Sequence, residues 1–182
     1  SSKNSEVQVV ALQKCLLLLG LLSHIDQDNE SLLIDYVLPK FRFLLQNMKH
    51  DIYGKIVFAQ SMSALTNVIF SFHDLVLENH LNSDDEIDEN ILHFNSKVLK
   101  YMELLTVALL TDENTHVRIA FLKNIAPICR LFGKERSSDI ILSHLITYLN
   151  DKSAALRVQF IETISGISVL LGTISFEQYI LP

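Results

Sequence analysis

The chain repeats one spacing of apolar residues four times, at offsets of 0, 4, 8, 11 and 15 positions. Steps of four and three residues keep the side chains on one face of an α-helix. Of the twenty places, only Gly54 is not apolar. The four series are Val7, Ala11, Cys15, Leu18, Leu22; Gly54, Phe58, Met62, Leu65, Ile69; Val117, Phe121, Ile125, Ile128, Phe132; and Leu156, Phe160, Ile164, Ile167, Leu171. The pattern predicts four amphipathic helices that bury this face.

Each of the first three series is followed by a second apolar stripe at helical spacing, which predicts a partner helix. One partner covers about 31–48, with a bend at Pro39, and another begins near Ile91. The third carries Ile141, Leu142, Leu145 and Leu149, and Ser138 or Asp139 can cap its start. The series therefore predict helical hairpins rather than single helices.

Corresponding positions of the last two units, such as Val117 and Leu156, lie 39 residues apart. Two-helix repeats of about 40 residues are typical of HEAT and armadillo proteins, and the lack of a third short helix favours HEAT. We predict an all-α fold, an α-solenoid of about four HEAT-type hairpins with the last one truncated. The predicted units are 5–48, 51–110, 114–150 and 153–182.

An acidic stretch at 79–90 interrupts the second unit and shows no apolar periodicity. We interpret it as an exposed insertion. Its charges could dock a basic partner or simply keep the insertion in solution, and the second role is the commoner one for charge runs. The candidate docking residues are Asp84, Asp85, Glu86, Asp88 and Glu89.

Composition excludes several classes of protein. The 182 residues include five glycines and three prolines, which suits long helices better than a β-sandwich. The net charge of −6 argues against a surface that binds nucleic-acid phosphates. Cys15 and Cys129 are too few and too far apart for a disulfide framework, and both fall on predicted core faces as reduced thiols.

The motifs of common enzyme and membrane classes are missing from the sequence. The glycines form no phosphate-binding loop, and neither HExxH nor GxSxG occurs. The longest continuous apolar run, from Cys15 to Leu22 and including Gly20, is far shorter than the roughly 20 residues of a transmembrane helix. We expect a non-catalytic segment without cofactor, metal site or transmembrane helix.

Two Asp–Arg sets recur with the 39-residue spacing, Asp112 with Arg118 and Asp151 with Arg157. Each Asp is expected at the positive N-terminus of the following helix, where a carboxylate can cap free N–H groups. Each Arg lies in the first turn and could reach an Asp of the next unit. The sets therefore predict a structural ladder of charges, because a catalytic carboxylate would also need a pocket and a partner.

The 39-residue units resemble a known family. The run LLTDENTHVRIAFLKNIAPICRLFGKERSSDIILSHLITYLNDK (109–152) is similar to the helical-repeat region of the regulatory, vacuolar-protein-sorting subunit of class III phosphatidylinositol 3-kinase. Its most specific part is SSDIILSHLITYLNDK followed by LRVQFIETISGISVLLG, and the acidic SDDEIDE run is also similar. One departure is Gly54-Lys55, where the last two units have Val-Arg and Leu-Arg, which leaves a ladder contact there in doubt.

The resemblance implies a scaffold that holds the lipid kinase catalytic subunit and beclin-type subunits together in vesicle trafficking and autophagy. It implies a cytoplasmic protein that lies peripherally on endosome, Golgi and autophagic membranes through the wider complex. The family's kinase-like domain lies outside such a segment, and no catalytic residue carries over. Two alternatives remain open: a HEAT scaffold of a protein phosphatase or transport receptor, and an all-helical enzyme.

Overall fold

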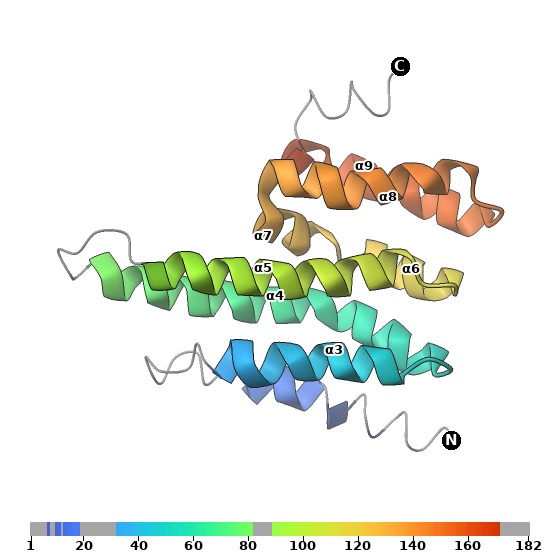
Figure 1. The fold of residues 1–182 in the computed structure, drawn as a ribbon. Coiled ribbons are helices and arrows are strands. Elements are labelled where there is room, and N and C mark those ends of the chain that lie inside the picture. The colour runs from blue at the N-terminus through green and yellow to red at the C-terminus, as the bar shows by residue number, and fades with distance from the viewer. Residues whose placement is uncertain (1–6, 8–9, 12, 19–31, 82–88, 172–182) are drawn as a thin grey trace.

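The computed structural model describes residues 7, 10–11, 13–18, 32–81 and 89–171, without the side chains of 73–81 and 89–94. Every regular element in this part of the chain is helical, which confirms the all-α prediction (Figure 1). The elements after residue 31 are η1 (Leu32–Val37), α3 (Leu38–Asn47), α4 (Ile52–Leu81), α5 (Glu89–Leu110), α6 (Thr115–Leu122), α7 (Ala126–Arg136), η2 (Ser137–Leu142), α8 (Ser143–Leu145), η3 (Ile146–Asn150) and α9 (Ala154–Leu171).

The helices stack in two layers, and the chain advances along the stack from α3 through α4 and α5 to α8 and α9 (Figure 1). In one layer, α6 and α7 lie between α4 and α9 and contact both. In the other, α5 lies between the η1–α3 segment and η2. Each inner helix therefore has a neighbour on both sides, which is the packing expected of repeated hairpins that cannot bury their apolar faces alone.

Three of the four apolar series identify the buried faces of their helices correctly. All members of the series that start at Gly54, Val117 and Leu156 are buried. All of them except Gly54 belong to one continuous core with the partner-helix residues Met102, Leu105, Ile141, Leu142 and Leu145. The exception among the named partner stripe is Leu149, which is exposed, while its neighbour Tyr148 is buried.

The prediction for the first series is wrong. Val7 and Leu18 are exposed, and so is Cys15, which was expected in the core. Leu16 is buried instead, on the side of this helix that lies beside α4. One residue corresponds to about 100° around a helix, so burial of Leu16 turns the Cys15 stripe outward. In contrast, Cys129 is buried as predicted, and burial raises the pKa of its thiol to about 12.

The third series does not form one helix. Lys123 to Ile125 separate α6 from α7, and Pro127 occupies the first turn of α7, where its missing N–H costs nothing. A second break falls at Gly133, whose φ of 72° and ψ of −179° are not helical. The helical backbone resumes directly after Gly133 and continues through Ser138, so the start predicted at Ser138 or Asp139 is wrong.

The ends of the acidic insertion are more regular than expected. Helix α4 continues to Leu81 and α5 begins at Glu89, so both helices extend into the stretch 79–90 that was expected to be irregular. Asp84, Asp85, Glu86 and Asp88 lie outside the described residues. Any role of these four carboxylates stays a prediction.

Helix α9 meets the length and composition of a membrane span, with 18 residues and a mean hydropathy of 1.4. Core helices of stacked proteins meet the same two conditions. The apolar series of α9 is buried, and the helix contacts α6, α7 and η3. Packing in the stack therefore accounts for the buried face of α9, whereas Val158, Ile161 and Val169 on its other side are exposed.

Candidate functional site: a charged ladder and a basic groove

Two ion pairs join successive hairpins and form what we call the charged ladder. Lys55 Nζ on α4 lies 2.7 Å from Asp112 Oδ2, which follows α5. Arg118 Nη1 on α6 lies 3.1 Å from Asp151 Oδ2, between η3 and α9. In both pairs the cation belongs to the first helix of one hairpin and the carboxylate to the turn before the next. Lys55 thus supplies the contact that the Gly54-Lys55 departure had left in doubt.

The ladder carboxylates also fix the turns in which they lie. Asp112 Oδ1 accepts a hydrogen bond of 2.8 Å from the Asn114 N–H, and Asp151 Oδ1 accepts one of 2.8 Å from the Ser153 N–H. The helix caps themselves are Asn114 Oδ1, which accepts from the His116 N–H, and Ser153 Oγ, which accepts from the Leu156 N–H. The carboxylates therefore hold the turn before each helix, and the prediction that they cap the helix directly is wrong.

A related cap explains Gly54. The N–H of Gly54 donates to Asp51 Oδ1 at 2.9 Å, at the start of α4. A Cβ atom on residue 54 would lie 2.3 Å from Asp51 Oδ2. Glycine therefore lets the Asp51 carboxylate close over the positive end of α4.

Tyr148 completes the second contact of the ladder, although the repeated Asp–Arg spacing did not indicate it. Its hydroxyl donates a hydrogen bond to the Leu110 carbonyl at the C-terminal end of α5. The Arg118 guanidinium lies 5.3 Å from the centre of its ring. Burial raises the pKa of Tyr148 to about 12, so the phenol stays a donor at neutral pH. One feature of the sequence could have indicated it. Tyr148 begins the run Tyr–Leu–Asn–Asp that leads into the turn, and a buried tyrosine hydroxyl needs a hydrogen-bond partner.

Arg157 contacts the backbone of its own unit. Its Nη1 donates to the carbonyl oxygens of Asp151, at 2.6 Å, and Lys152, at 3.3 Å, within the turn that precedes its own helix. Its guanidinium also lowers the pKa of Asp151. Among the four ladder residues singled out from the sequence, the structure thus brings Arg118, Asp151 and Arg157 together and pairs Asp112 with Lys55.

Replacing Asp151 by asparagine is expected to remove a pH-dependent part of the stability. The pKa of Asp151 lies below its ordinary value, chiefly because the Ser153 N–H donates to the carboxylate and next because Arg118 pairs with it. A lowered pKa in the folded state means that the ion contributes stability above the unfolded-state pKa, which is about 4, and loses it as the pH falls. Urea unfolding should therefore give Asp151→Asn a lower free energy of unfolding than wild type at neutral pH. The two free energies should converge as the pH falls. A constant difference at every pH would contradict this.

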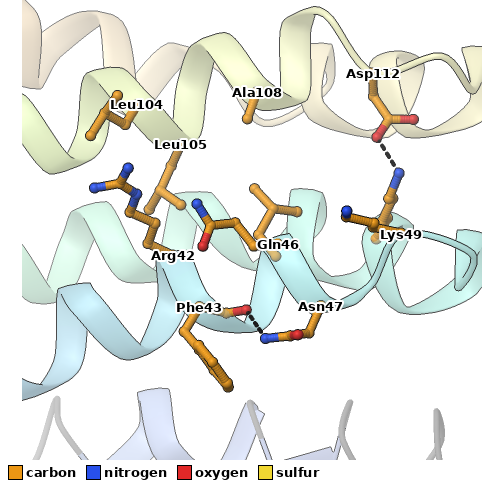
Figure 2. Close-up of a pocket in the computed structure, with 11 residues that line it drawn as sticks. Arg42, Phe43, Gln46, Asn47, Lys49, Leu104, Leu105, Ala108 and Asp112 are labelled. Atoms are coloured by element: carbon orange, nitrogen blue, oxygen red, sulfur yellow. Dashed lines mark hydrogen bonds and ion pairs between the residues drawn. The ribbon is translucent and has the colours of Figure 1, made fainter.

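A groove runs between α3 and α5, in the layer formed by η1, α3, α5 and η2, which we call the second layer (Figure 2). Its larger part has a volume of about 670 Å³, and a smaller part of about 350 Å³ shares Arg42 and Leu104 with it. Figure 2 shows Arg42 and Gln46 of α3 on one side, with Leu104 and Ala108 of α5 opposite. The Lys55–Asp112 pair closes one end. We refer to this surface as the α3–α5 groove.

The charges that line the α3–α5 groove are mostly positive. Five cationic side chains face two carboxylates, Asp112 and Asp35, and Asp112 is already paired. The cations are Arg42, Lys49, Lys55, Lys97 and Lys100. This contrasts with the net charge of −6 for the whole chain. No sequence pattern indicated the groove, because the two sides of the groove come from different hairpins.

Comparison with known proteins identifies the family. The family model described as "PIK3R4-like, middle domain" matches residues 1–182. The chain belongs to this family. A protein of Candida glabrata named non-specific serine/threonine protein kinase is 40% identical over 98% of the chain. The serine/threonine-protein kinase VPS15 of Saccharomyces cerevisiae is 45% identical over 79% of the chain, and a putative VPS15 of Komagataella pastoris is 37% identical over 80%.

This PIK3R4-like middle domain is a small part of those relatives. It spans 13% of the Candida protein and 10% of the Saccharomyces protein. The kinase activity in their names is a property of the whole relatives, whereas the matching model describes a middle domain. The family resemblance noted from residues 109–152 is thereby confirmed over the whole chain.

Proposed function

We propose that this middle domain is a non-catalytic scaffold segment of HEAT-type hairpins in the regulatory subunit of the class III phosphatidylinositol 3-kinase complex. The observation that carries the proposal is the family match over the entire chain. Stacked helical hairpins suit the role, because such arrays present long surfaces to other proteins. The names of the VPS15 relatives support a part in vesicle trafficking, and autophagy follows by the same resemblance.

The charges of the charged ladder support a structural rather than a catalytic role. Lys55, Asp112, Arg118 and Asp151 form two pairs, each of which joins parts of the chain more than 30 residues apart. A catalytic carboxylate or base would instead need a free face toward a bound substrate. The pairing of these side chains with one another fits a segment that keeps its hairpins in register.

The proposed partners are the lipid kinase catalytic subunit and the beclin-type subunits of the same complex. The proposed location is the cytoplasm, peripheral to endosome, Golgi and autophagic membranes through the wider complex. The resemblance to the family supports both proposals.

Deletion within the full-length regulatory subunit tests the scaffold role. A protein without residues 1–182 should no longer co-purify the lipid kinase catalytic subunit together with the beclin-type subunits from cells. The matched control is the full-length subunit carrying Val169→Ala, an exposed position on α9 outside the α3–α5 groove. Recovery of the intact complex with the deleted protein, at the level of the control, would refute the proposal.

A further inference from the structure

The α3–α5 groove has the shape of a binding site for an extended or helical segment. Its two parts share Arg42 and Leu104, so they form one depression along both helices. Leu105 is buried at its base, whereas Leu104 on the α5 side is 40% exposed. Ile34, Pro39 and Tyr101 line the smaller part. The groove thus offers apolar contacts along its length, including a large aliphatic side chain that the stack leaves partly open.

Four of the five cations of the groove have no anionic partner within the described part of the chain. The ion pairs there are Lys55–Asp112, Arg118–Asp151 and Arg136–Glu103, so Arg42, Lys49, Lys97 and Lys100 take part in none. All four side chains are exposed. Positive charges that gather in one depression raise the local concentration of anionic groups.

The next junction between second-layer helices differs in this respect. Arg136, which directly precedes η2, faces Glu103 of α5 at 4.0 Å, so opposite charges meet across that junction. Across the α3–α5 groove, Arg42, Lys97 and Lys100 line one cavity in which Asp35 is the single carboxylate, so positive charges predominate there. Like charges lower stability when they lie close together. Packing of the stack therefore does not require this arrangement, but binding of an anionic partner would benefit from it.

The geometry points to a docking site for an acidic segment of a partner protein that carries large apolar side chains. Its carboxylates would face Arg42, Lys97 and Lys100, and an apolar side chain would cover Leu104. Charge complementarity favours an acidic occupant, and the apolar base favours a polypeptide over a lipid headgroup, which would meet the cations alone. This inference deepens the proposed scaffold role by giving one of its surfaces a partner of defined chemistry.

Selection from a randomised peptide display library on the 182-residue chain tests the inference. The peptides selected should be rich in Asp and Glu with Leu or Phe among them. Their affinity, measured by fluorescence anisotropy with a labelled selected peptide, should fall by about tenfold or more in the triple variant Arg42→Glu, Lys97→Glu, Lys100→Glu. The loss should be reproduced in part by Leu104→Ala, which keeps every charge.

The matched control reverses three exposed cations outside the groove, Lys123→Glu, Lys134→Glu and Lys152→Glu. It changes the net charge equally and should keep the affinity near wild type. Thermal unfolding of each variant distinguishes loss of binding from loss of fold. Selected peptides without acidic bias, equal losses in both triple variants, or binding of phosphatidylserine vesicles in place of peptides would overturn the inference. If complex assembly survives deletion of residues 1–182 but peptide binding behaves as described, the scaffold proposal fails while the groove stands.

Discussion

Replacing Phe121 by alanine is expected to lower the free energy of unfolding by about 3–5 kcal/mol. Phe121 is fully buried on α6, which lies between α4 and α9. Truncation removes apolar contacts and leaves a cavity that a close-packed core fills only in part. Urea unfolding followed by circular dichroism measures the change.

The position of α6 makes the expected loss cooperative. Because α6 contacts the helices before and after it, a defect there weakens two junctions of the stack at once. Hydrogen exchange should therefore show faster exchange in both α4 and α9 and not only in α6. Exchange that rises in α6 alone, with the other helices unchanged, would contradict a cooperative stack.

Phe43→Ala provides the matched control for size and chemistry. Phe43 is 56% exposed, and Lys40 Nζ lies 5.4 Å from the centre of its ring. The change should cost less than about 1 kcal/mol. Similar losses for Phe43→Ala and Phe121→Ala would mean that the buried series does not carry the stability of the fold.

The success of three apolar series and the failure of the first have one physical cause. A spacing of four and three residues identifies an apolar face, but only a neighbouring helix decides whether that face is covered. The series of α4, α6–α7 and α9 lie in a layer in which each helix has another beside it. In the segment 13–18 the covered side is the one that faces α4, which includes Leu16 and excludes Cys15.

The candidate sites also differ in whether a sequence pattern could predict them. Repeated Asp–Arg spacing indicated the ladder, because each contact recurs at the same place in successive hairpins. Tyr148 and the α3–α5 groove have no such repetition. The groove exists only where α3 and α5 come together, so its cations are scattered from Arg42 to Lys100 in the sequence. Their common location depends on how far apart two helices pack, which no local pattern contains.

Replacing Gly133 by alanine is expected to lower the free energy of unfolding by about 1–3 kcal/mol. With φ at 72° and ψ at −179°, Gly133 occupies a region of backbone conformation that side chains with a Cβ atom rarely adopt. No atom lies within 4 Å of the place where that Cβ would be. The cost therefore comes from the backbone alone, at the point where the first helix of the third hairpin turns into the second.

Gly166→Ala is the matched control and should have the opposite sign. Gly166 also lies in open space, but within the regular helix α9, where alanine loses less backbone entropy than glycine. The same added methyl group should therefore raise the free energy of unfolding by about 0.5–1 kcal/mol. Both variants can be measured by urea unfolding under one set of conditions. Equal changes in the free energy of unfolding for Gly133→Ala and Gly166→Ala would show that the turn at Gly133 tolerates an ordinary residue. The conformation of Gly133 would then not explain the break between the two helices of that hairpin.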